Sequence, residues 1–271
     1  GQLVEHMIDM SAILSAGPTV LQTAGGEAIE IPITTGFSSA ALTAEAAAIA
    51  ESDPAFGKRT LGAYKYGVLV QVARELVEDT GVDLQGFLAR QCGWAVGNAL
   101  GTDLIVGNAV SKPSGIVQTA STGVTGGAGV VGAFTADNLI DLYWSVIAPY
   151  RKSPSAAWIM KDATMAGVRK LKDTTNQYLW QPGLLLGAPD MLLGKPVYTD
   201  PNVAGVALSA KSIIFGDISR YFVRLAGGVR FEQSADYAFN SDLITFKAVV
   251  RADGILADQT GAVKVFVGNA A

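Results

Sequence analysis

Two strand-like runs separated by a long segment of small residues place the strongest constraint on the fold. Residues 27–35 alternate, with the isoleucines on one face and Pro32 on the other, as in an edge strand. Residues 58–72 form a second β-rich run, and residues 36–57 between the runs are rich in alanine, serine and glutamate. We therefore predict an extended hairpin over about 27–72. An isolated hairpin is only marginally stable, so this one must lie on another surface.

A long helix is predicted directly after the hairpin, over residues 83–106, with Asp83 as its N-cap. Apolar side chains recur every three or four residues along one face of it, namely Leu84, Leu88, Cys92, Ala95 and Ala99. At ~1.5 Å per residue the helix is a rod of about 35 Å. Gly93, Gly97 and Gly101 recur along it, and each costs ~1 kcal/mol relative to alanine. We expect these glycines to allow the close approach of a neighbouring backbone.

The remaining segments predict a mixture of helices and strands. The first 26 residues resemble a loosely structured arm with a short helix at 7–14. Thr135 to Asn138 is predicted to cap a helix at 137–148, which Pro149 ends. We then predict a buried strand at 156–160, a helix at 162–172, and strands at 197–198, 212–216, 220–225, 229–232, 243–251 and 263–267. The chain is therefore expected to be α+β, with no linker dividing it.

The composition indicates a surface that is largely covered by something else. Of the 271 residues, 49% are hydrophobic and 16% charged, whereas an ordinary domain carries roughly 25% charged residues. The mean hydropathy is +0.32, yet no segment supplies the ~20 consecutive apolar residues of a spanning helix. We therefore expect no membrane partner, and we attribute the shortage of charge to contacts with other subunits.

Residues that could carry catalysis or bind metal are scarce. The single Cys92 excludes an internal disulfide, and the single His6 removes most histidine-based catalysis and metal binding. Glu75, Glu78 and Asp79 are more typical of a solvated or subunit-facing helix face than of an acid–base pair. The net charge of −4 and the pI near 5.0 do not indicate a nucleic-acid binder. No catalytic residue, cofactor or metal is predicted.

Three further patterns have plain structural interpretations. The run 127–132 matches G-x-G-x-x-G, but no buried strand precedes it and no helix opens from it, so a flexible loop is favoured. A nucleotide-binding cytosolic enzyme is kept as the less favoured alternative. The basic cluster at 169–172 is interpreted as a solvated helix face, and Trp158 and Trp180 as core or interface residues.

Short motifs also follow one another in a specific order along nearly the whole chain. They are Glu75-Leu76-Val77-Glu78-Asp79, Asp83-Leu84, Gly107-Asn108, Lys112-Pro113-Ser114-Gly115-Ile116, Trp158-Ile159-Met160, Leu171-Lys172-Asp173, Tyr178-Leu179-Trp180-Gln181-Pro182, Leu193-Gly194-Lys195-Pro196-Val197 and Phe215-Gly216-Asp217. In this order and spacing the sequence resembles the tailed-bacteriophage major capsid protein family. The resemblance implies a non-enzymatic structural protein that self-assembles into an icosahedral head shell around double-stranded DNA. The alternative is an encapsulin-type nanocompartment shell protein, which has the same shell fold.

The resemblance also implies a division of the chain. It gives an N-terminal arm at 1–26, an extended hairpin loop at 27–72, a peripheral domain at 73–135 with a spine helix at 83–106, a mostly axial domain at 136–225, and return strands of both domains at 226–271. A chain that begins at Gly1 fits removal of a scaffolding segment by a maturation protease as well as it fits a trimmed chain.

The implied partners are other copies of the chain, arranged as pentamers and hexamers in a virion assembled in the host cytoplasm. Portal and decoration proteins and DNA bound without sequence specificity are further expected partners. Our candidates for contacts between subunits are Glu45, Glu51, Asp53, Lys58, Arg59, Gly93, Gly97, Lys112 and Pro113. Some family members crosslink through a lysine in the extended loop. Because residues 36–57 contain no lysine, we predict a shell without such crosslinks.

Overall fold

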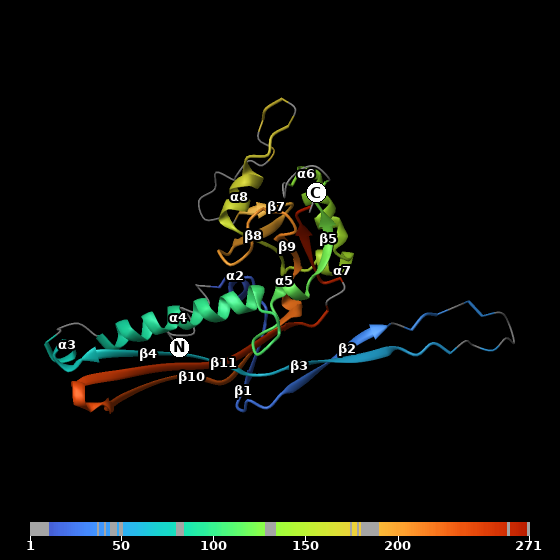
Figure 1. The fold of residues 1–271 in the computed structure, drawn as a ribbon. Helices are drawn as coiled ribbons and strands as arrows, with labels where there is room; N and C mark the ends of the chain where they lie inside the picture. Colours follow the sequence, from blue (N-terminus) through green and yellow to red (C-terminus); the bar gives the residue numbers. More distant parts are fainter. Residues whose placement is uncertain are drawn as a thin grey trace.

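The computed structural model describes residues 11–36, 38–40, 42–43, 48, 51–79, 84–127, 134–173, 175–177, 179, 190–258 and 261–269. Within these residues the strands form a four-stranded sheet, a six-stranded sheet and a separate two-stranded hairpin. Figure 1 shows the hairpin projecting from the side of the other two sheets. Helices accompany both larger sheets, so the predicted α+β class is confirmed.

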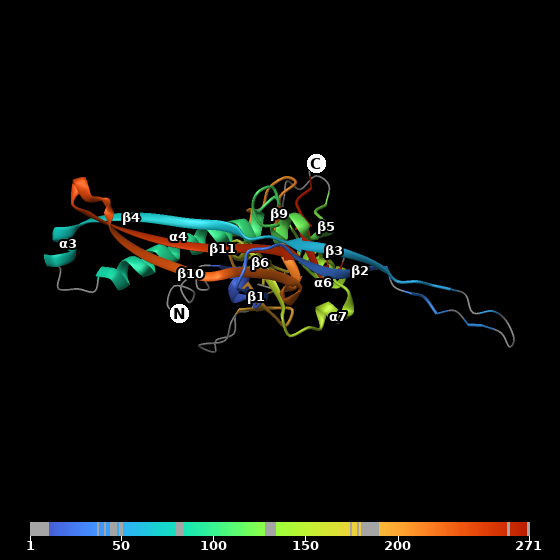
Figure 2. The same ribbon diagram turned by 90° about the horizontal axis from the view of Figure 1, so that it is seen from below.

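The four-stranded sheet is long and carries the long helix on one face. Its strand order is β1 (Thr19–Thr23), β10 (Tyr221–Ala238), β11 (Leu243–Leu256) and β4 (Tyr64–Ala73). The β1 strand runs parallel to β10, and the other pairs are antiparallel. Helix α4 (Leu84–Val106) lies along this sheet in both views (Figures 1 and 2). The predicted helix is thus confirmed from Leu84 onward, whereas its proposed cap, Asp83, lies outside the described residues.

The buried face of α4 differs in part from the predicted one, because Leu88 and Cys92 are buried whereas Ala95 and Ala99 are exposed. Cys92, Val96, Leu100 and Leu104 are buried against the sheet, and burial raises the pKa of the Cys92 thiol. A Cβ atom added at Gly101 would lie 3.3 Å from both the Cβ and the Oγ of Ser11. Helix α2 (Ala12–Ser15) begins directly after Ser11, so the close approach that this glycine allows is made by the chain's own N-terminal segment.

The six-stranded sheet builds the second half of the body. Its order is β5 (Ser121–Thr125), β12 (Val263–Val267), β9 (Lys211–Asp217), β6 (Ala156–Met160), β8 (Lys195–Thr199) and β7 (Met191–Leu192). Strand β6 is buried along its whole length, as predicted for 156–160. Helices α6 (Ala136–Ser145) and α8 (Asp162–Arg169) pack on the face that carries Trp158 and Phe215. The opposite face of the sheet joins the core formed by α4 and the long sheet.

The hairpin is shorter than predicted. Strand β2 (Ile29–Gly36) pairs with β3 (Ala55–Leu61), but β4 pairs with β11 in the long sheet. The predicted hairpin over 27–72 is therefore wrong beyond Leu61. Partly buried and exposed residues alternate along β4, and its partly buried face packs against the core of the body. The strand therefore belongs to the long sheet and not to the hairpin.

Three parts of the expected division need correction. The predicted loosely structured arm at 1–26 is wrong for residues 12–23, because α2 packs in the core and β1 is a strand of the long sheet. Strand β5 pairs with β12, so residues 121–125 belong with the second sheet and not with the 73–135 segment that contains the long helix. Strand β10 starts at Tyr221, so residues 221–225 leave the 136–225 segment for the long sheet. The two strands predicted at 220–225 and 229–232 are one strand, bulged at Gly227 and Gly228, whose φ angles are +72° and +69°.

The helices around the second sheet differ from prediction at their ends. A capping box starts α6, in which the Thr135 hydroxyl accepts from the amide of Asn138 at 3.2 Å. The helix ends at Ser145 because Val146 is extended, and Pro149 stands in the first turn of a separate helix, α7 (Ala148–Arg151). Helix α8 ends at Arg169 and not at 172. The shorter elements are α3 (Arg74–Asp79), α5 (Ile116–Thr119), η1 (Ile218–Arg220) and η2 (Phe239–Ser241).

Candidate functional site

The hairpin presents apolar side chains far from the core of its own chain. Phe56 is 73% exposed and Leu42 is fully exposed. Both belong to the stretch of chain that Figures 1 and 2 show extending away from the two larger sheets. Large apolar side chains in such a position mark a surface that another molecule covers.

The charged residues predicted on the hairpin fall into two groups. Glu51 and Asp53 are both exposed, near its outer part. The Lys58 ammonium lies 2.6 Å from the Glu30 carboxylate, so this residue joins the two hairpin strands to each other. Arg59 lies opposite Ile31 in the register of the hairpin. Glu45 lies outside the described residues.

A second apolar surface lies on α6 and the turn that follows it. Ile140, Trp144 and Ile147 are spaced at one helical turn and are 43%, 63% and 52% exposed. The Arg151 guanidinium carbon lies 3.9 Å from the centre of the Trp144 ring, which is a cation–π contact. Exposed aromatic and arginine side chains together are typical of protein–protein interfaces. The helix was predicted, but none of these outward-facing residues was among the predicted contacts.

Further apolar side chains are exposed along the long sheet and its helix. Phe87 and Trp94 on α4 are 46% and 39% exposed, and they lie seven residues apart on the same side of the helix. Tyr237, near the end of β10, is 70% exposed. The connection between β10 and β11 lies at the opposite end of the molecule from the hairpin (Figure 2). Apolar contacts are thus available at both ends, as a protein needs when it joins different neighbours through different surfaces.

The loop after α4 is held within the chain. The Lys112 ammonium lies 3.4 Å from Asp103, whose carboxylate also accepts a 2.9 Å hydrogen bond from the Tyr66 hydroxyl. Burial, together with this bond to Asp103, raises the pKa of Tyr66. Pro113 is buried, and a Cβ atom added at Gly107 would clash with its carbonyl oxygen. These contacts give the two loop residues that we predicted at subunit interfaces a clear role inside the subunit.

The helix glycines are similarly placed. Gly93 and Gly97 are buried within a single chain, on the same helix as Gly101 and its contact with Ser11. Their burial favours packing inside the subunit. A contact with a second copy at these two positions stays a prediction.

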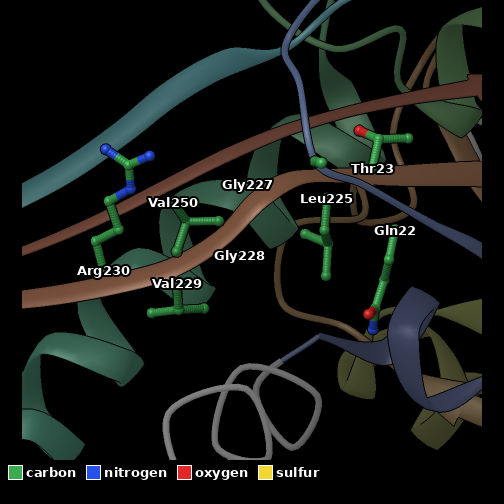
Figure 3. Close-up of a pocket in the computed structure, with 9 residues that line it drawn as sticks. Gln22, Thr23, Leu225, Gly227, Gly228, Val229, Arg230 and Val250 are labelled. Carbon is green, nitrogen blue, oxygen red and sulfur yellow. The ribbon is translucent and has the colours of Figure 1, made fainter.

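A cavity of about 570 Å³ lies where β1 ends beside the bulge of β10. Figure 3 shows Leu225 and Val229 pointing to the same side of β10, near Gln22 from β1. The full lining is Gln22, Thr23, Ala24, Leu225, Gly227, Gly228, Val229, Arg230 and Val250. This lining offers no carboxylate, cysteine or histidine, so it holds neither a nucleophile with its base nor a metal ligand set.

The other sequence patterns are placed as follows. Trp158 is fully buried, and its indole donates to the carbonyl of Leu192 at 3.0 Å, which confirms the core interpretation. Arg169 lies 2.5 Å from Asp190, and Glu75 is exposed. Several other predicted positions lie outside the residues that the structure describes. They are His6, Trp180, the side chains of Glu78 and Asp79, and most of the glycine-rich run 127–132.

Neither a metal site nor a membrane span is found in the described part of the chain. Its residues include no group of three or more histidine, cysteine, aspartate or glutamate side chains that could hold a metal ion. None of the helices in this part is long and apolar enough to cross a membrane. The features that stand out are therefore surfaces for association, on the hairpin, on α6 and along α4.

Comparisons with known proteins identify a family and solved structures that this chain resembles. The model of the phage capsid family matches residues 1–267. Among solved structures, the one described as "Capsid of native GTA particle computed with C5 symmetry" has a TM-score of 0.83 at 24% identity, covering 95% of this chain and 90% of that chain. A chain from Microbacterium phage Oxtober96 gives a TM-score of 0.74 at 15% identity, covering 96% and 91%. One from Mycobacterium phage Adephagia gives 0.72 at 16% identity, covering 96% and 90%. No curated protein sequence matches.

The family model and the structural likeness carry different conclusions. The structures are less than 25% identical to this chain, so they show that it has the phage capsid fold. The family match spans nearly the whole sequence and favours a capsid over a nanocompartment or a nucleotide-binding enzyme. The chain belongs to the phage capsid family and is a structural, non-enzymatic protein that forms a capsid shell.

Proposed function

We propose that copies of this chain associate as pentamers and hexamers into an icosahedral head shell that encloses double-stranded DNA. The observation that carries this proposal is the exposure of Phe56 and Leu42 on the hairpin, since neither side chain is buried in the core of its own chain. A stable protein–protein interface buries about 1,200–2,000 Å², and an arm that crosses a neighbour can supply much of that area. The similar GTA capsid is described with C5 symmetry, which is consistent with pentamers.

The two halves of the body have separate roles in this proposal. The long sheet with α4 is the peripheral domain, and α4 is its spine helix. The six-stranded sheet with α6, α7 and α8 is the axial domain, which meets its copies around the fivefold and sixfold centres. The apolar surface of Ile140, Trp144 and Ile147 belongs to this second half and supplies a contact there.

The remaining partners follow from a shell that packages DNA. The chain carries a net charge of −4, and a neutral or acidic inner wall would not trap the DNA by phosphate contacts. We further propose that contacts with the DNA carry no sequence specificity. Portal and decoration proteins complete the head, which assembles in the host cytoplasm. A strongly basic inner surface in an assembled shell would contradict the proposed wall.

The shell is held by non-covalent contacts. Residues 36–57 contain no lysine, and Lys58 is paired with Glu30 across the hairpin. Denaturing electrophoresis of purified shells should therefore show a single band at the mass of the chain. A ladder of covalent multimers would overturn this part of the proposal.

The test of the hairpin contact is the variant Phe56→Ser, with shells counted by electron microscopy. Phe56 is 73% exposed, so we expect the free energy of unfolding to change by less than about 0.5 kcal/mol. The yield of shells should fall at least about tenfold if an aromatic anchor is lost from each interface. Val206→Ser, which also changes an exposed apolar residue, is the control and should leave the yield unchanged. Normal shells from Phe56→Ser would count against the hairpin contact.

A further inference from the structure

A buried arginine stands where the hairpin joins the body. Arg224 is 1% exposed, on β10, and is the only arginine among the described residues that is fully buried. A guanidinium removed from water is costly unless its N–H groups are satisfied by hydrogen bonds. The partners of this side chain therefore show what it stabilises.

Its partners come from both ends of the hairpin. The Arg224 Nη1 atom donates to the carbonyls of Leu61 and Gly62, at 3.1 and 2.9 Å, where β3 ends. The Nη2 atom donates to the carbonyl of Gly25 at 3.0 Å, and Nε donates to the Thr23 hydroxyl at 3.0 Å. These last two residues lie a few positions before β2. One planar group thus ties the entry and the exit of the hairpin to the long sheet.

An aspartate on the next strand completes this arrangement. Asp253 lies directly opposite Arg224 in the register of β10 and β11 and is 5% exposed. Its carboxylate accepts a 2.5 Å hydrogen bond from the amide of Gly62 and a 2.7 Å bond from the amide of Gly254. The residue Gly62 is therefore held from both sides, through its carbonyl by the arginine and through its amide by the aspartate.

The hairpin has little else in its backbone to fix its direction. Among the described strands, β2 and β3 form hydrogen bonds in the sheet only with each other. An isolated two-stranded hairpin is only marginally stable, so its direction depends on contacts at its base. A second arginine, Arg251, packs beside the same turn, because a Cβ atom added at Gly26 would lie 2.7 Å from its Nη1 atom. Rotation of the hairpin about its base would break several of these bonds at once.

We propose that Arg224 and Asp253 form a positioning pair that fixes the direction in which the hairpin leaves the body, and thereby sets the geometry of the contact between neighbouring copies. The second part rests on the proposed function, since it requires that the hairpin reaches another subunit. Arginine suits the role because its planar fork donates to four acceptors in fixed directions, whereas lysine offers a single ammonium.

The direct test measures the hairpin's orientation in the unassembled chain. Two spin labels are placed at Glu51→Cys on the hairpin and Asp141→Cys on α6, in a Cys92→Ser background. Pulsed electron spin resonance then gives the distribution of distances between them. We expect a narrow distribution in the parent and one about twice as wide in Arg224→Gln, because the hydrogen bonds at the base are lost. An unchanged width in a folded Arg224→Gln would overturn the proposal.

Matched variants separate positioning from general damage. Arg230→Gln alters an exposed arginine on the same strand and should leave the width unchanged. Arg224→Lys should recover only part of the narrow distribution, because it retains the charge and loses the fork. If Arg224→Gln does not fold, Thr23→Val removes one acceptor at a half-buried position. A widened distribution there supports the pair, and an unchanged one contradicts it.

Failure of the pair and failure of the proposed function give different results. If Arg224→Gln widens the distribution while shells form normally, the pair holds the hairpin and the hairpin is not needed for assembly. If the width is unchanged while Phe56→Ser abolishes shells, the hairpin contact stands and the positioning pair is wrong. Both parts are supported when Arg224→Gln widens the distribution and also yields misshapen or fewer shells.

Discussion

The body and the hairpin of this subunit bury their apolar residues in different ways. In the body, Trp158 and Phe215 are fully buried and lie 4.3 Å apart between ring centres, within a core built by the same chain. In the hairpin, Phe56 is mostly exposed, and the two strands pair only with each other. The body thus has a core of its own. In the proposed shell the hairpin buries its apolar residues on a second copy, so we expect stability and assembly to depend on different parts of the chain.

The largest expected effect comes from a substitution in the core of the body. Trp158→Ala removes a fully buried ring, its contact with Phe215 and its hydrogen bond to Leu192. We expect the free energy of unfolding to fall by about 3–5 kcal/mol, measured by chemical denaturation. No shells should form, because the monomer itself is compromised. A variant with near-parent stability would show that the core does not depend on this residue.

The two regions also differ in how far the sequence predicts them. Helix α4 was predictable because its apolar spacing is local, and so was a hairpin between the two β-rich runs, although β3 begins at Ala55, within the segment that was assigned to the tip. The point where the hairpin ends was not predictable from the sequence. Strand β4 alternates as a hairpin strand would, and only its pairing with β11 shows that it belongs to the long sheet. Strand β5 was misplaced for the same reason, since its partner β12 lies at the other end of the chain.

The candidate site was predicted only in part. The small-residue tip and the family resemblance predicted that the hairpin contacts another subunit, and this contact stays a prediction. The role of Arg224 could not be inferred, because its acceptors at Leu61 and Gly25 lie 163 and 199 residues away in the sequence. Trp144 could have been found, since Ile140, Trp144 and Ile147 follow helical spacing on the outer side of a predicted helix.

An intermediate effect sharpens the distinction between stability and assembly. Trp144 is 63% exposed and contacts Arg151, so Trp144→Ala should change the free energy of unfolding by no more than about 1 kcal/mol. If α6 meets a neighbouring copy, the concentration needed for assembly should rise about tenfold, since an interface tryptophan commonly contributes more than 1 kcal/mol. Light scattering during assembly measures this concentration. An unchanged value would remove this surface from the proposed contacts.

The smallest expected effect compares two ion pairs of equal length. Lys247 and Glu232 lie 2.6 Å apart across two strands of the body, and Lys58 and Glu30 lie 2.6 Å apart across the hairpin. The hydrogen bond and charge of Lys247 lower the pKa of Glu232. The stabilisation from the body pair is therefore present above the ordinary glutamate pKa and is lost as the pH falls through the lowered one. It is small because both side chains are exposed and solvent screens them.

The variants Lys247→Met and Lys58→Met test whether the two regions are energetically separate. In Lys247→Met, the pKa of Glu232, followed by NMR titration, should rise toward its ordinary value, and the dependence of global stability on acid pH should weaken slightly. In Lys58→Met, global stability should stay the same, because the hairpin has no core of its own to lose. Faster amide exchange confined to β2 and β3 is the expected result there. A drop in global stability from Lys58→Met would instead show that the hairpin and the body fold as one cooperative unit, and the division drawn between them would fail.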